Sequence, residues 1–376
     1  MALPPPAAPG MGLDAIDTPA LVLDLDAFER NLARMAEAVA AAGVRLRPHA
    51  KTHKSPLIAR RQIALGAVGA CCQKVSEAEI LVDGGVDDVL VSNQVVGAGK
   101  LARLAALARR AALAVCVDDA GNARDLSAAA LRAGARIGVL VEIDVGAGRC
   151  GVAPGADAVR LALEVAALPG LRFAGLQAYQ GAAQHLRGAG ERRDAIGRAG
   201  ELTSRTVAML AERGLACATV AGAGTGSFEF EAASGIWNEL QAGSYIFMDA
   251  DYARNEAGDG GVFEHALFVL ATVMSHPTAR RAVLDAGLKA LAFDSGPPEV
   301  FGRAGVVYDG ASDEHGRLVL DGSNAALGIG DKLLLVPGHC DPTVNLHDWY
   351  VGVRGLGEAG AVVEAVWPVA ARGAMF

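Results

Sequence analysis

Short apolar runs and longer segments of helical period alternate along most of the chain. The runs, rich in Val, Ile and Leu, predict strands at 20–24, 44–48, 67–72, 88–93, 113–118, 137–144, 171–179, 218–224 and 239–245. Between several of them, segments rich in Ala, Leu and Arg predict helices at 27–42, 97–111, 121–134, 156–168 and 190–213. This alternation is typical of βα units around a parallel sheet.

The number and spacing of these strands predict an α/β fold with a TIM-type (β/α)8 barrel. Eight of the nine strands lie between residues 44 and 245, which is a normal length for such a barrel. The strand at 20–24 precedes the repeat, and we expect it to pair elsewhere, with the C-terminal part of the chain as the candidate partner. Polar residues stand at or just after the ends of the eight barrel strands, where this fold builds active sites, although loops are polar in any case: Lys51, Gln73, Asn93, Asp118, Arg149, Tyr179, Thr225 and Ser244.

After about residue 265 the pattern changes to short apolar runs that glycines interrupt and that no helical segments separate. RLVLDG, DKLLLVPG and DWYVGVRG are examples. They predict a separate all-β domain, with an irregular extension of the barrel as the alternative. We therefore divide the chain into a flexible, Pro- and Ala-rich arm at 1–17, a barrel at 18–262 and a β domain at 263–376.

Composition narrows the class of protein. The net charge of −8 comes with no block of Lys or Arg, so neither nucleic acid nor an anionic membrane is an expected partner. No apolar stretch reaches about 18 residues, and the N-terminus lacks a basic region, so we expect neither a membrane span nor a secretory signal. The six cysteines form no Cys-x-x-Cys pair; we interpret them as buried free thiols of a cytoplasmic protein.

The segment RPHAKTHK (47–54) follows a predicted strand with an unusual density of basic side chains. Lys51 would stand at the mouth of the barrel, crowded by Arg47, Lys54 and two histidines. Nearby positive charges lower the pKa of an amine, and a neutral amine is what Schiff-base chemistry requires. A solvated basic loop is the alternative interpretation of this segment.

Two glycine-rich turns follow the last two barrel strands, VAGAGTGS (220–227) and LQAGSY (240–245). Turns at this place in the fold bind phosphate through backbone N–H groups and hydroxyls, which Thr225 and Ser244 would supply here. The glycines could also serve the turns alone.

A third segment, PGHCDPTVNLHDWYVG (337–352), lies in the predicted β domain. On an extended strand, His339 and Asp341 would point the same way and Cys340 the opposite way. One imidazole and one carboxylate can hold a divalent ion whose other ligands are water or substrate. His347 and Asp348 are less well placed, and a polar turn is the alternative.

The segment QAYQGAAQH (177–185) carries one further candidate for chemistry. Tyr179 ends a predicted strand, and His185 lies in the loop that follows it. A histidine there could act as a general base near neutral pH, or could be an ordinary surface residue.

Taken together, these segments resemble the fold-type III, alanine racemase-like enzymes that use pyridoxal 5'-phosphate (PLP). The likeness is greatest to the metal-dependent branch of this family, which includes D-threonine aldolases, D-serine dehydratases and 3-hydroxy-D-aspartate aldolases. Within this branch, the sequence most resembles the 3-hydroxy-D-aspartate aldolases. It spans residues 18–354 and includes TPALVLDLDAFERN, CCQKVSEAE, VEIDVGAGRCG, ELQAGSYIFMDADY, PGHCDPT and HDWYVGVR.

The resemblance implies a role for each site residue. Lys51 would carry PLP covalently, Arg149 would lie near its phenolic oxygen and Tyr179 would partner its ring nitrogen. Thr225, Gly243 and Ser244 would cradle the phosphate, and Gln73 and Tyr252 would make further cofactor contacts. The catalytic base would be His185, with a metal-bound hydroxide as the alternative, and the metal ligands would be His339 and Asp341.

The resemblance further implies a lyase that cleaves a β-hydroxy-D-amino acid to glycine and an aldehyde, with Mg or Mn as the bound ion. The first expected substrate is 3-hydroxy-D-aspartate, for which the aldehyde is glyoxylate. Cleavage of D-threonine, and dehydration of D-serine or 3-hydroxyaspartate, are the alternatives. A cysteine replaces the aspartate ligand in some dehydratases, so Asp341 favours the aldolase. A non-catalytic PLP carrier is a more remote alternative, because such carriers lack a β domain and a metal pair. Family members are homodimers in which one subunit's β domain completes the other's barrel mouth.

Overall fold

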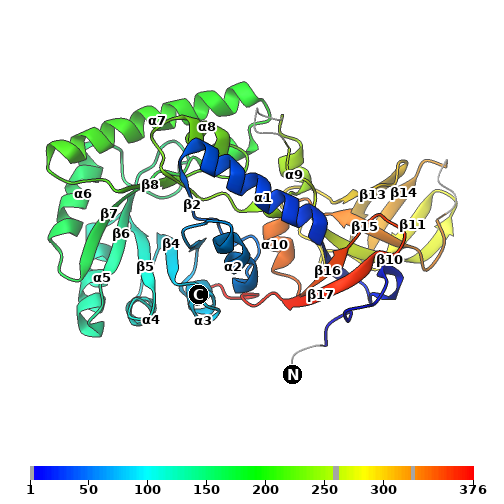
Figure 1. The fold of residues 1–376 in the computed structure, drawn as a ribbon. Helices are drawn as coiled ribbons and strands as arrows, with labels where there is room; N and C mark the ends of the chain where they lie inside the picture. The colour runs from blue at the N-terminus through cyan, green and yellow to red at the C-terminus, as the bar shows by residue number, and fades with distance from the viewer. Residues whose placement is uncertain (1–3, 257–261, 323–326) are drawn as a thin grey trace.

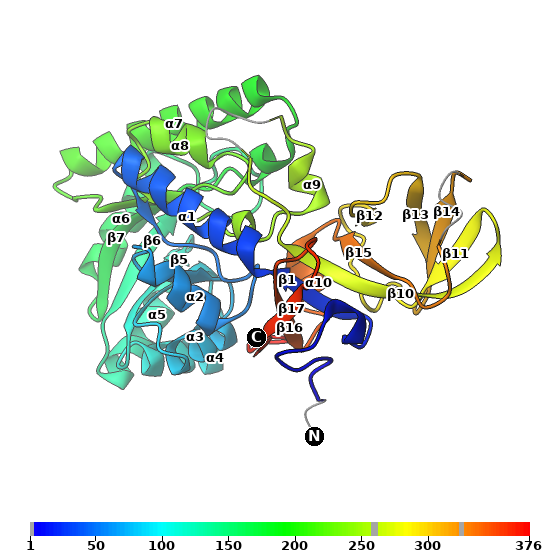
Figure 2. The ribbon, with the colours of Figure 1, turned by 45° about the vertical axis from the view of Figure 1, so that its right-hand side comes forward.

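The computed structural model describes residues 4–256, 262–322 and 327–376 and contains two sheets. Figure 1 shows a barrel ringed by helices on the left and a β-rich domain on the right, and Figure 2 shows the same two parts after rotation. Among the described residues, no helix combines the length and the apolar character that crossing a membrane requires.

The first sheet is the predicted barrel of eight parallel strands. In spatial order it runs β2, β9, β8, β7, β6, β5, β4 and β3. The ring closes between its two ends through a bridge from His49 to Cys71, where the Ala50 N–H donates to the Cys71 carbonyl at 2.7 Å. The strands are β2 (Arg45–Leu46), β3 (Ala70–Cys72), β4 (Asp88–Gln94), β5 (Ala112–Val117), β6 (Ile137–Glu142), β7 (Leu171–Gln177), β8 (Thr219–Gly222) and β9 (Glu239–Leu240).

Helices cover the outer face of this barrel, and side chains of the strands fill its interior, so β6, for example, is buried along its whole length. α5 illustrates how local sequence sets the helix ends. The Asp119 side chain accepts from the Asn122 N–H at its start, and Gly134 ends it in the left-handed region at φ 62°. The helices are α1 (Leu25–Ala42), α2 (Pro56–Ala64), α3 (Val75–Asp83), α4 (Ala98–Leu107), α5 (Ala120–Ala133), α6 (Ala156–Ala167), α7 (Ala189–Glu212), α8 (Phe228–Ala233) and α9 (Ala250–Ala253).

The interior of the barrel is a packed apolar layer. Its members are Cys71, Leu90, Cys116, Leu140, Ala174 and Ala221. Burial raises the pKa of the Cys71 thiol to about 12, so this sulfur is an inert apolar group. All six cysteines are free thiols, as predicted, but only four are buried, since Cys150 and Cys217 are partly exposed.

The second sheet forms the β domain and includes the strand at the start of the chain. β1 lies between β10, which is antiparallel to it, and β16, which is parallel. The strands are β1 (Ala20–Asp24), β10 (Leu267–Thr278), β11 (Arg281–Leu284), β12 (Glu299–Val300), β13 (Val306–Ala311), β14 (Gly316–Leu320), β15 (Lys332–Val336), β16 (Trp349–Arg354) and β17 (Val362–Pro368).

The structure differs from the sequence prediction in two parts of this domain. Residues 4–17 are not a free arm, because Gly10 donates to the Val363 carbonyl at 2.8 Å and Ile16 is fully buried. The domain also contains a helix, α10 (Cys340–Val344), within the segment that we expected to be extended.

Short 3-10 helices occur in both domains, at η1 (Leu13–Ala15), η2 (Gly181–His185) and η3 (Ser244–Ile246).

Candidate active site

A cavity opens at the C-terminal ends of the barrel strands, the place where this fold builds active sites. All eight residues that we expected to contact a cofactor line this cavity: Lys51, Gln73, Arg149, Tyr179, Thr225, Gly243, Ser244 and Tyr252. Two other expected rim residues lie outside its lining. Asn93 donates to the Gln73 carbonyl, and Asp118 accepts from the Gly151 N–H.

Lys51 faces a carboxylate rather than other cations. Its Nζ lies 3.3 Å from Oδ2 of Asp341. The charge of Asp341 raises the pKa of Lys51, and burial, which acts in the opposite direction, is the smaller influence. Our expectation of a depressed lysine pKa is therefore wrong for the protein without its cofactor.

The basic neighbours of Lys51 along the chain are neutralised by other carboxylates. Arg47 points toward the opposite end of the barrel, where its Nε lies 2.8 Å from Oε1 of Glu239. Lys54 is buried and pairs with Glu77 at 2.7 Å. The cluster of positive charge seen in RPHAKTHK is thus dispersed by the fold.

The expected metal pair lies beside Lys51, although not on a strand. His339 is the N-cap residue of α10, and Asp341 lies in the first turn of this helix. Their side chains still meet, with His339 Nε2 4.0 Å from Asp341 Oδ1. Cys340 is fully buried, and its Sγ contacts the Met248 carbonyl at 3.8 Å.

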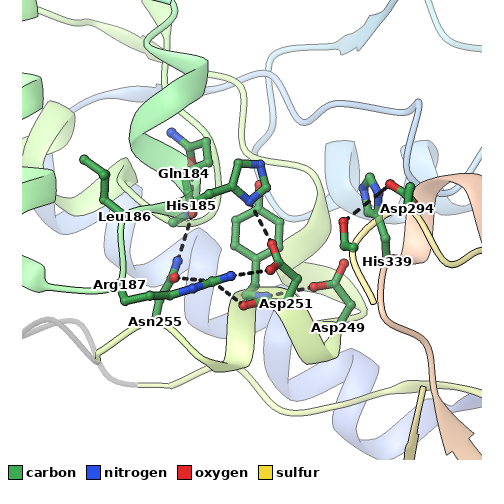
Figure 3. Close-up of polar contacts among 12 residues, drawn as sticks. Gln184, His185, Leu186, Arg187, Asp249, Asp251, Asn255, Asp294 and His339 are labelled. Atoms are coloured by element: carbon green, nitrogen blue, oxygen red, sulfur yellow. Dashed lines mark hydrogen bonds and ion pairs between the residues drawn. The ribbon is translucent and has the colours of Figure 1, made fainter. Parts of the chain in front are cut away.

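An aspartate that the sequence analysis did not single out orients His339. Its Nδ1 lies 2.7 Å from Oδ2 of Asp294, and Figure 3 shows this contact. When Nδ1 carries the proton that Asp294 accepts, Nε2 presents a lone pair on the side of Asp341. A carboxylate behind a histidine is the usual support of a metal-binding imidazole.

The carboxylate of the pair is ionised, whereas the imidazole must give up a proton to bind a cation. Burial acts against protonation of His339, but the charge of Asp341 and the hydrogen bond to Asp294 raise its pKa, so a bound cation would displace that proton. Burial opposes ionisation of Asp341, but Lys51 and His339 outweigh it and lower the pKa of this carboxyl. Its Oδ1 is buried without a hydrogen-bond partner. Nowhere in the described ranges do three or more His, Cys, Asp or Glu side chains converge as a metal cluster, so any ion here would have few protein ligands. His347 and Asp348 contact Ala290 and Arg372 instead.

The turns after β8 and β9 present hydroxyls suited to a phosphate group. The Thr225 Oγ1 is buried and has no hydrogen-bond partner. Thr52, which lies beside Gly243 in the same cavity, carries a second buried hydroxyl with no hydrogen-bond partner. In the turn after β8, Ala223 adopts a positive φ of 71°, a conformation that costs free energy for a residue with a side chain and is common at ligand sites.

Gly243 is the position where this cradle tolerates no side chain. A Cβ there would lie 2.8 Å from the His49 carbonyl oxygen and 2.8 Å from the Thr52 Oγ1. We expect Gly243→Ala to weaken PLP binding by about tenfold or more, about 1.4 kcal/mol, as measured by cofactor titration. Gly190→Ala is the matched control, because nothing lies within 4 Å of its added Cβ. Equal cofactor affinity in both variants would contradict this assignment.

Arg149 and Tyr179 form the wall between β6 and β7. The Arg149 guanidinium lies 5.5 Å from the centre of the Tyr179 ring, and its Nη2 lies 3.7 Å from Oε1 of Glu142. Burial raises the pKa of Tyr179, although Lys51 and Arg149 act against it. The phenol is therefore neutral, as expected for an uncharged partner of a pyridine nitrogen.

His185 lies at the edge of the cavity rather than in its lining. It ends η2, and its ring centre is 6.2 Å from that of Tyr252, which does line the cavity. Its side chain is 59% exposed, and its Nδ1 contacts Asp251 Oδ2 at 2.8 Å. The expected base therefore has both access to solvent and a fixed partner.

Several lining residues were not predicted. They are His49, Thr52, Ser92, Ala223, Gly224, Gln177 and Gln241. Most stand within or beside the motifs already discussed. His49 directly precedes the turn at 50–53 that carries Lys51, and its Nδ1 accepts from the Lys51 N–H at 3.3 Å; its closeness to Lys51 in the sequence could have identified it. Asp294 offers no such signal, because it lies in a loop far from the metal motif in sequence.

Comparisons with known proteins agree with this architecture. The family described as alanine racemase, N-terminal domain, matches residues 23–251, and a serine dehydratase domain matches residues 266–353. The chain is 52% identical to D-threonine aldolase of Arthrobacter sp., covering 99% of this chain and 97% of the relative. It is also 52% identical to 3-hydroxy-D-aspartate aldolase of Paracoccus denitrificans (strain Pd 1222), with 98% and 95% covered.

The crystal structure of D-threonine aldolase from Filomicrobium marinum superposes with a TM-score of 0.97 at 58% identity, covering 99% of this chain and all of that one. A more distant relative, D-threo-3-hydroxyaspartate dehydratase of Delftia sp. (strain HT23), is 32% identical over 87% of this chain and 92% of its own. The chain therefore belongs to the fold-type III, alanine racemase-like family of PLP enzymes. Within that family, its C-terminal domain is of the D-serine dehydratase-like kind.

Proposed function

We propose that the protein is a PLP- and divalent-metal-dependent aldolase that cleaves a β-hydroxy-D-amino acid to glycine and an aldehyde. 3-Hydroxy-D-aspartate, which would give glyoxylate, is the substrate that we place first. The observation that carries the proposal is that Lys51 lies beside the His339–Asp341 pair. Nζ of Lys51 is 3.3 Å from Oδ2 of Asp341.

The residues of the cavity fit PLP. Lys51 would hold it covalently, and the unpartnered Thr225 hydroxyl, with Gly243 and Ser244, would hold its phosphate. The neutral Tyr179 would face its ring nitrogen. Arg149, Gln73 and Tyr252 complete the contacts. When bound, PLP supplies an electron sink for the bond that breaks at Cα.

His339 and Asp341 fit a divalent cation, for which we propose Mg or Mn. The unpartnered Asp341 Oδ1 and the lone pair of His339 Nε2 face each other across 4.0 Å. Two protein ligands leave positions for water and for a substrate oxygen, as in catalytic rather than structural sites. A bound cation would lower the pKa of a substrate hydroxyl.

The chain's own residues would then handle the proton. His185 would accept the proton of the β-hydroxyl at Nε2, since its Nδ1 is engaged by Asp251. The Cα–Cβ bond breaks as the hydroxyl oxygen becomes a carbonyl oxygen, and a proton added at Cα completes glycine. Asp341 keeps the Lys51 amine close by.

Dehydration would use the same groups differently, with Lys51 removing the Cα proton and hydroxide leaving from Cβ. The position of Cys340 favours the aldolase, because the thiol is fully buried against the Met248 carbonyl and Asp341 stands beside Lys51. The two relatives described above at 52% identity, and the solved structure at 58% identity, are all named aldolases.

Product analysis tests the proposal directly. We expect the holoenzyme with Mg or Mn to convert 3-hydroxy-D-aspartate to glycine and glyoxylate, with D-threonine as the compared substrate. Ammonia and a 2-oxo acid as the main products would show a dehydratase. Absence of both product pairs from a PLP-loaded, metal-loaded protein would contradict the proposed function.

We also propose a cytoplasmic homodimer, which the resemblance to the family and the six free thiols support. Within one chain, the metal pair already lies at the barrel mouth of its own subunit, because Asp341 contacts Lys51. We therefore propose that each site takes its lysine and its metal pair from the same subunit.

A mixing experiment checks this arrangement. Protomers with Lys51→Ala mixed with protomers with His339→Ala should regain no activity, because each site takes both groups from one chain. Subunit exchange is verified by mass spectrometry of differently tagged chains, and a mixture of wild-type and Lys51→Ala protomers serves as the control. Recovery of activity in the doubly mutant mixture would show that the sites are shared.

A further inference from the structure

We infer that Asp251 is a positioning residue for His185. Its carboxylate fixes the imidazole in the tautomer whose Nε2 is free to accept a proton, and Arg187 keeps that carboxylate charged. This inference adds a positioning residue to the proposed function, and it rests on that function in taking His185 as the catalytic base.

The contact between His185 and Asp251 is short and comes from two different elements. Nδ1 of His185, at the end of η2, lies 2.8 Å from Oδ2 of Asp251, in α9. The Asp251 residue is only 6% exposed, whereas the His185 side chain is 59% exposed. A buried carboxylate therefore holds one nitrogen of a ring whose remaining face is open toward solvent and Tyr252.

Arg187 occupies the other oxygen of the same carboxylate. Its Nη2 donates to Asp251 Oδ1, and its Nη1 donates to the Asp251 carbonyl at 2.7 Å and to Asn255 Oδ1 at 2.7 Å. Figure 3 shows Asp251 between His185 and Arg187. Burial opposes ionisation of Asp251, but Arg187 and His185 outweigh it and lower the pKa of this carboxyl.

The backbone of the His185 segment is held as well. The Asn255 side chain donates to the Gln184 carbonyl at 3.0 Å. At the start of α9, Asp249 accepts from the Tyr252 N–H and the Cys340 N–H, both at 3.0 Å. α9 thus connects the proposed base, a cavity-lining tyrosine and the residue next to His339, so that few degrees of freedom remain between them.

This geometry determines which nitrogen acts. An ionised carboxylate only accepts, so the Nδ1 that faces Asp251 must carry a proton, and neutral His185 then has its lone pair on Nε2. When Nε2 takes the proton of a β-hydroxyl, the O–H bond breaks, an N–H bond forms, and the ring becomes an imidazolium. Asp251 stabilises that charge and does not take the proton, because Arg187 donates to it throughout.

Two substitutions at Asp251 separate this role from a structural one. In Asp251→Asn, Arg187 retains the amide oxygen, so the amide NH2 faces Nδ1 and donates to it. This forces the proton to Nε2 and blocks the base. In Asp251→Ala, the ring is unrestrained and both tautomers are populated. We therefore expect Asp251→Asn to lower kcat by about 100-fold or more relative to the wild type. Asp251→Ala should lower it less, although asparagine is the closer match to aspartate in shape.

The experiment measures the tautomer and the rate separately on the full-length holoenzyme. Histidine labelled with 15N reports whether each ring nitrogen is protonated, and His185→Gln assigns the signals. We expect protonated Nδ1 in the wild type and protonated Nε2 in Asp251→Asn. Asp194→Asn, which removes an exposed charge on α7, should leave both tautomer and rate unchanged.

Each result has a definite meaning. Unprotonated Nδ1 in the wild type, or a rate for Asp251→Asn equal to or above that for Asp251→Ala, would overturn the inference. The tautomer is read without substrate, so it stands or falls independently of the proposed activity. A wild type that cleaves no β-hydroxy-D-amino acid, yet shows the expected tautomers, would instead contradict the proposed function.

Discussion

Replacing Lys51 with alanine is expected to abolish turnover and to remove the visible absorbance of lysine-bound PLP. Lys51 is the lysine in the cavity lining, and its Nζ lies where strand β2 opens into the barrel mouth. Without this amine, the cofactor has no covalent anchor there and must rely on its phosphate and ring contacts. Absorbance spectra and product assays of the purified variant measure both losses.

Lys100→Ala is the matched control, because Lys100 is exposed on α4 and does not line the cavity. It should keep both the spectrum and the activity of the wild type. Borohydride reduction followed by peptide mapping locates the modified lysine. A covalent adduct at another lysine in the wild type would refute the assignment of Lys51.

Removal of the divalent cation is expected to cost several kcal/mol of transition-state stabilisation, at least about 100-fold in rate, while PLP stays bound. A chelator should stop turnover of the wild type, and Mg or Mn should restore it. The reason is that the open positions of a two-residue site belong to water and substrate, so that the fold does not depend on the ion.

Two variants distinguish loss of the ion from disturbance of Lys51. Asp341→Ala removes both a proposed ligand and the carboxylate that contacts Lys51, whereas His339→Ala removes only a ligand. Both should lose metal, as measured by elemental analysis after dialysis, and neither should regain the wild-type rate with added Mg or Mn. Wild-type activity that persists in a chelator, with metal shown to be absent, would refute the metal role.

The order of the elements could be predicted because it depends on local patterns. Buried strands such as β6 are continuous apolar runs, and long helices such as α5 carry a capping residue and a terminal glycine in the sequence itself. The shorter helices α2 and α3 were missed, because each has only nine residues and its period is hard to separate from the strands on either side.

The lining of the cavity could also be predicted, because a closed parallel barrel brings the C-terminal ends of its strands together whatever the loops contain. Strand-end residues such as Gln73, Arg149 and Tyr179 therefore meet once the barrel exists. The segment of His339 and Asp341 was expected to be a strand and is the start of a helix, yet both side chains reach the same place.

Only the tertiary structure determined which oppositely charged side chains pair with one another at the site. Sequence neighbours suggested that Lys51 is surrounded by cations, but the fold turns Arg47 toward Glu239, pairs Lys54 with Glu77 and brings Asp341 to Lys51 from the other domain. The carboxylate partners of His339 and His185 could not be predicted either, because Asp294 and Asp251 are remote from these histidines along the chain. Electrostatic energy falls with distance in space, not in sequence, so local pattern determined the elements and the strand-end residues, while the charge states of the site required the folded chain.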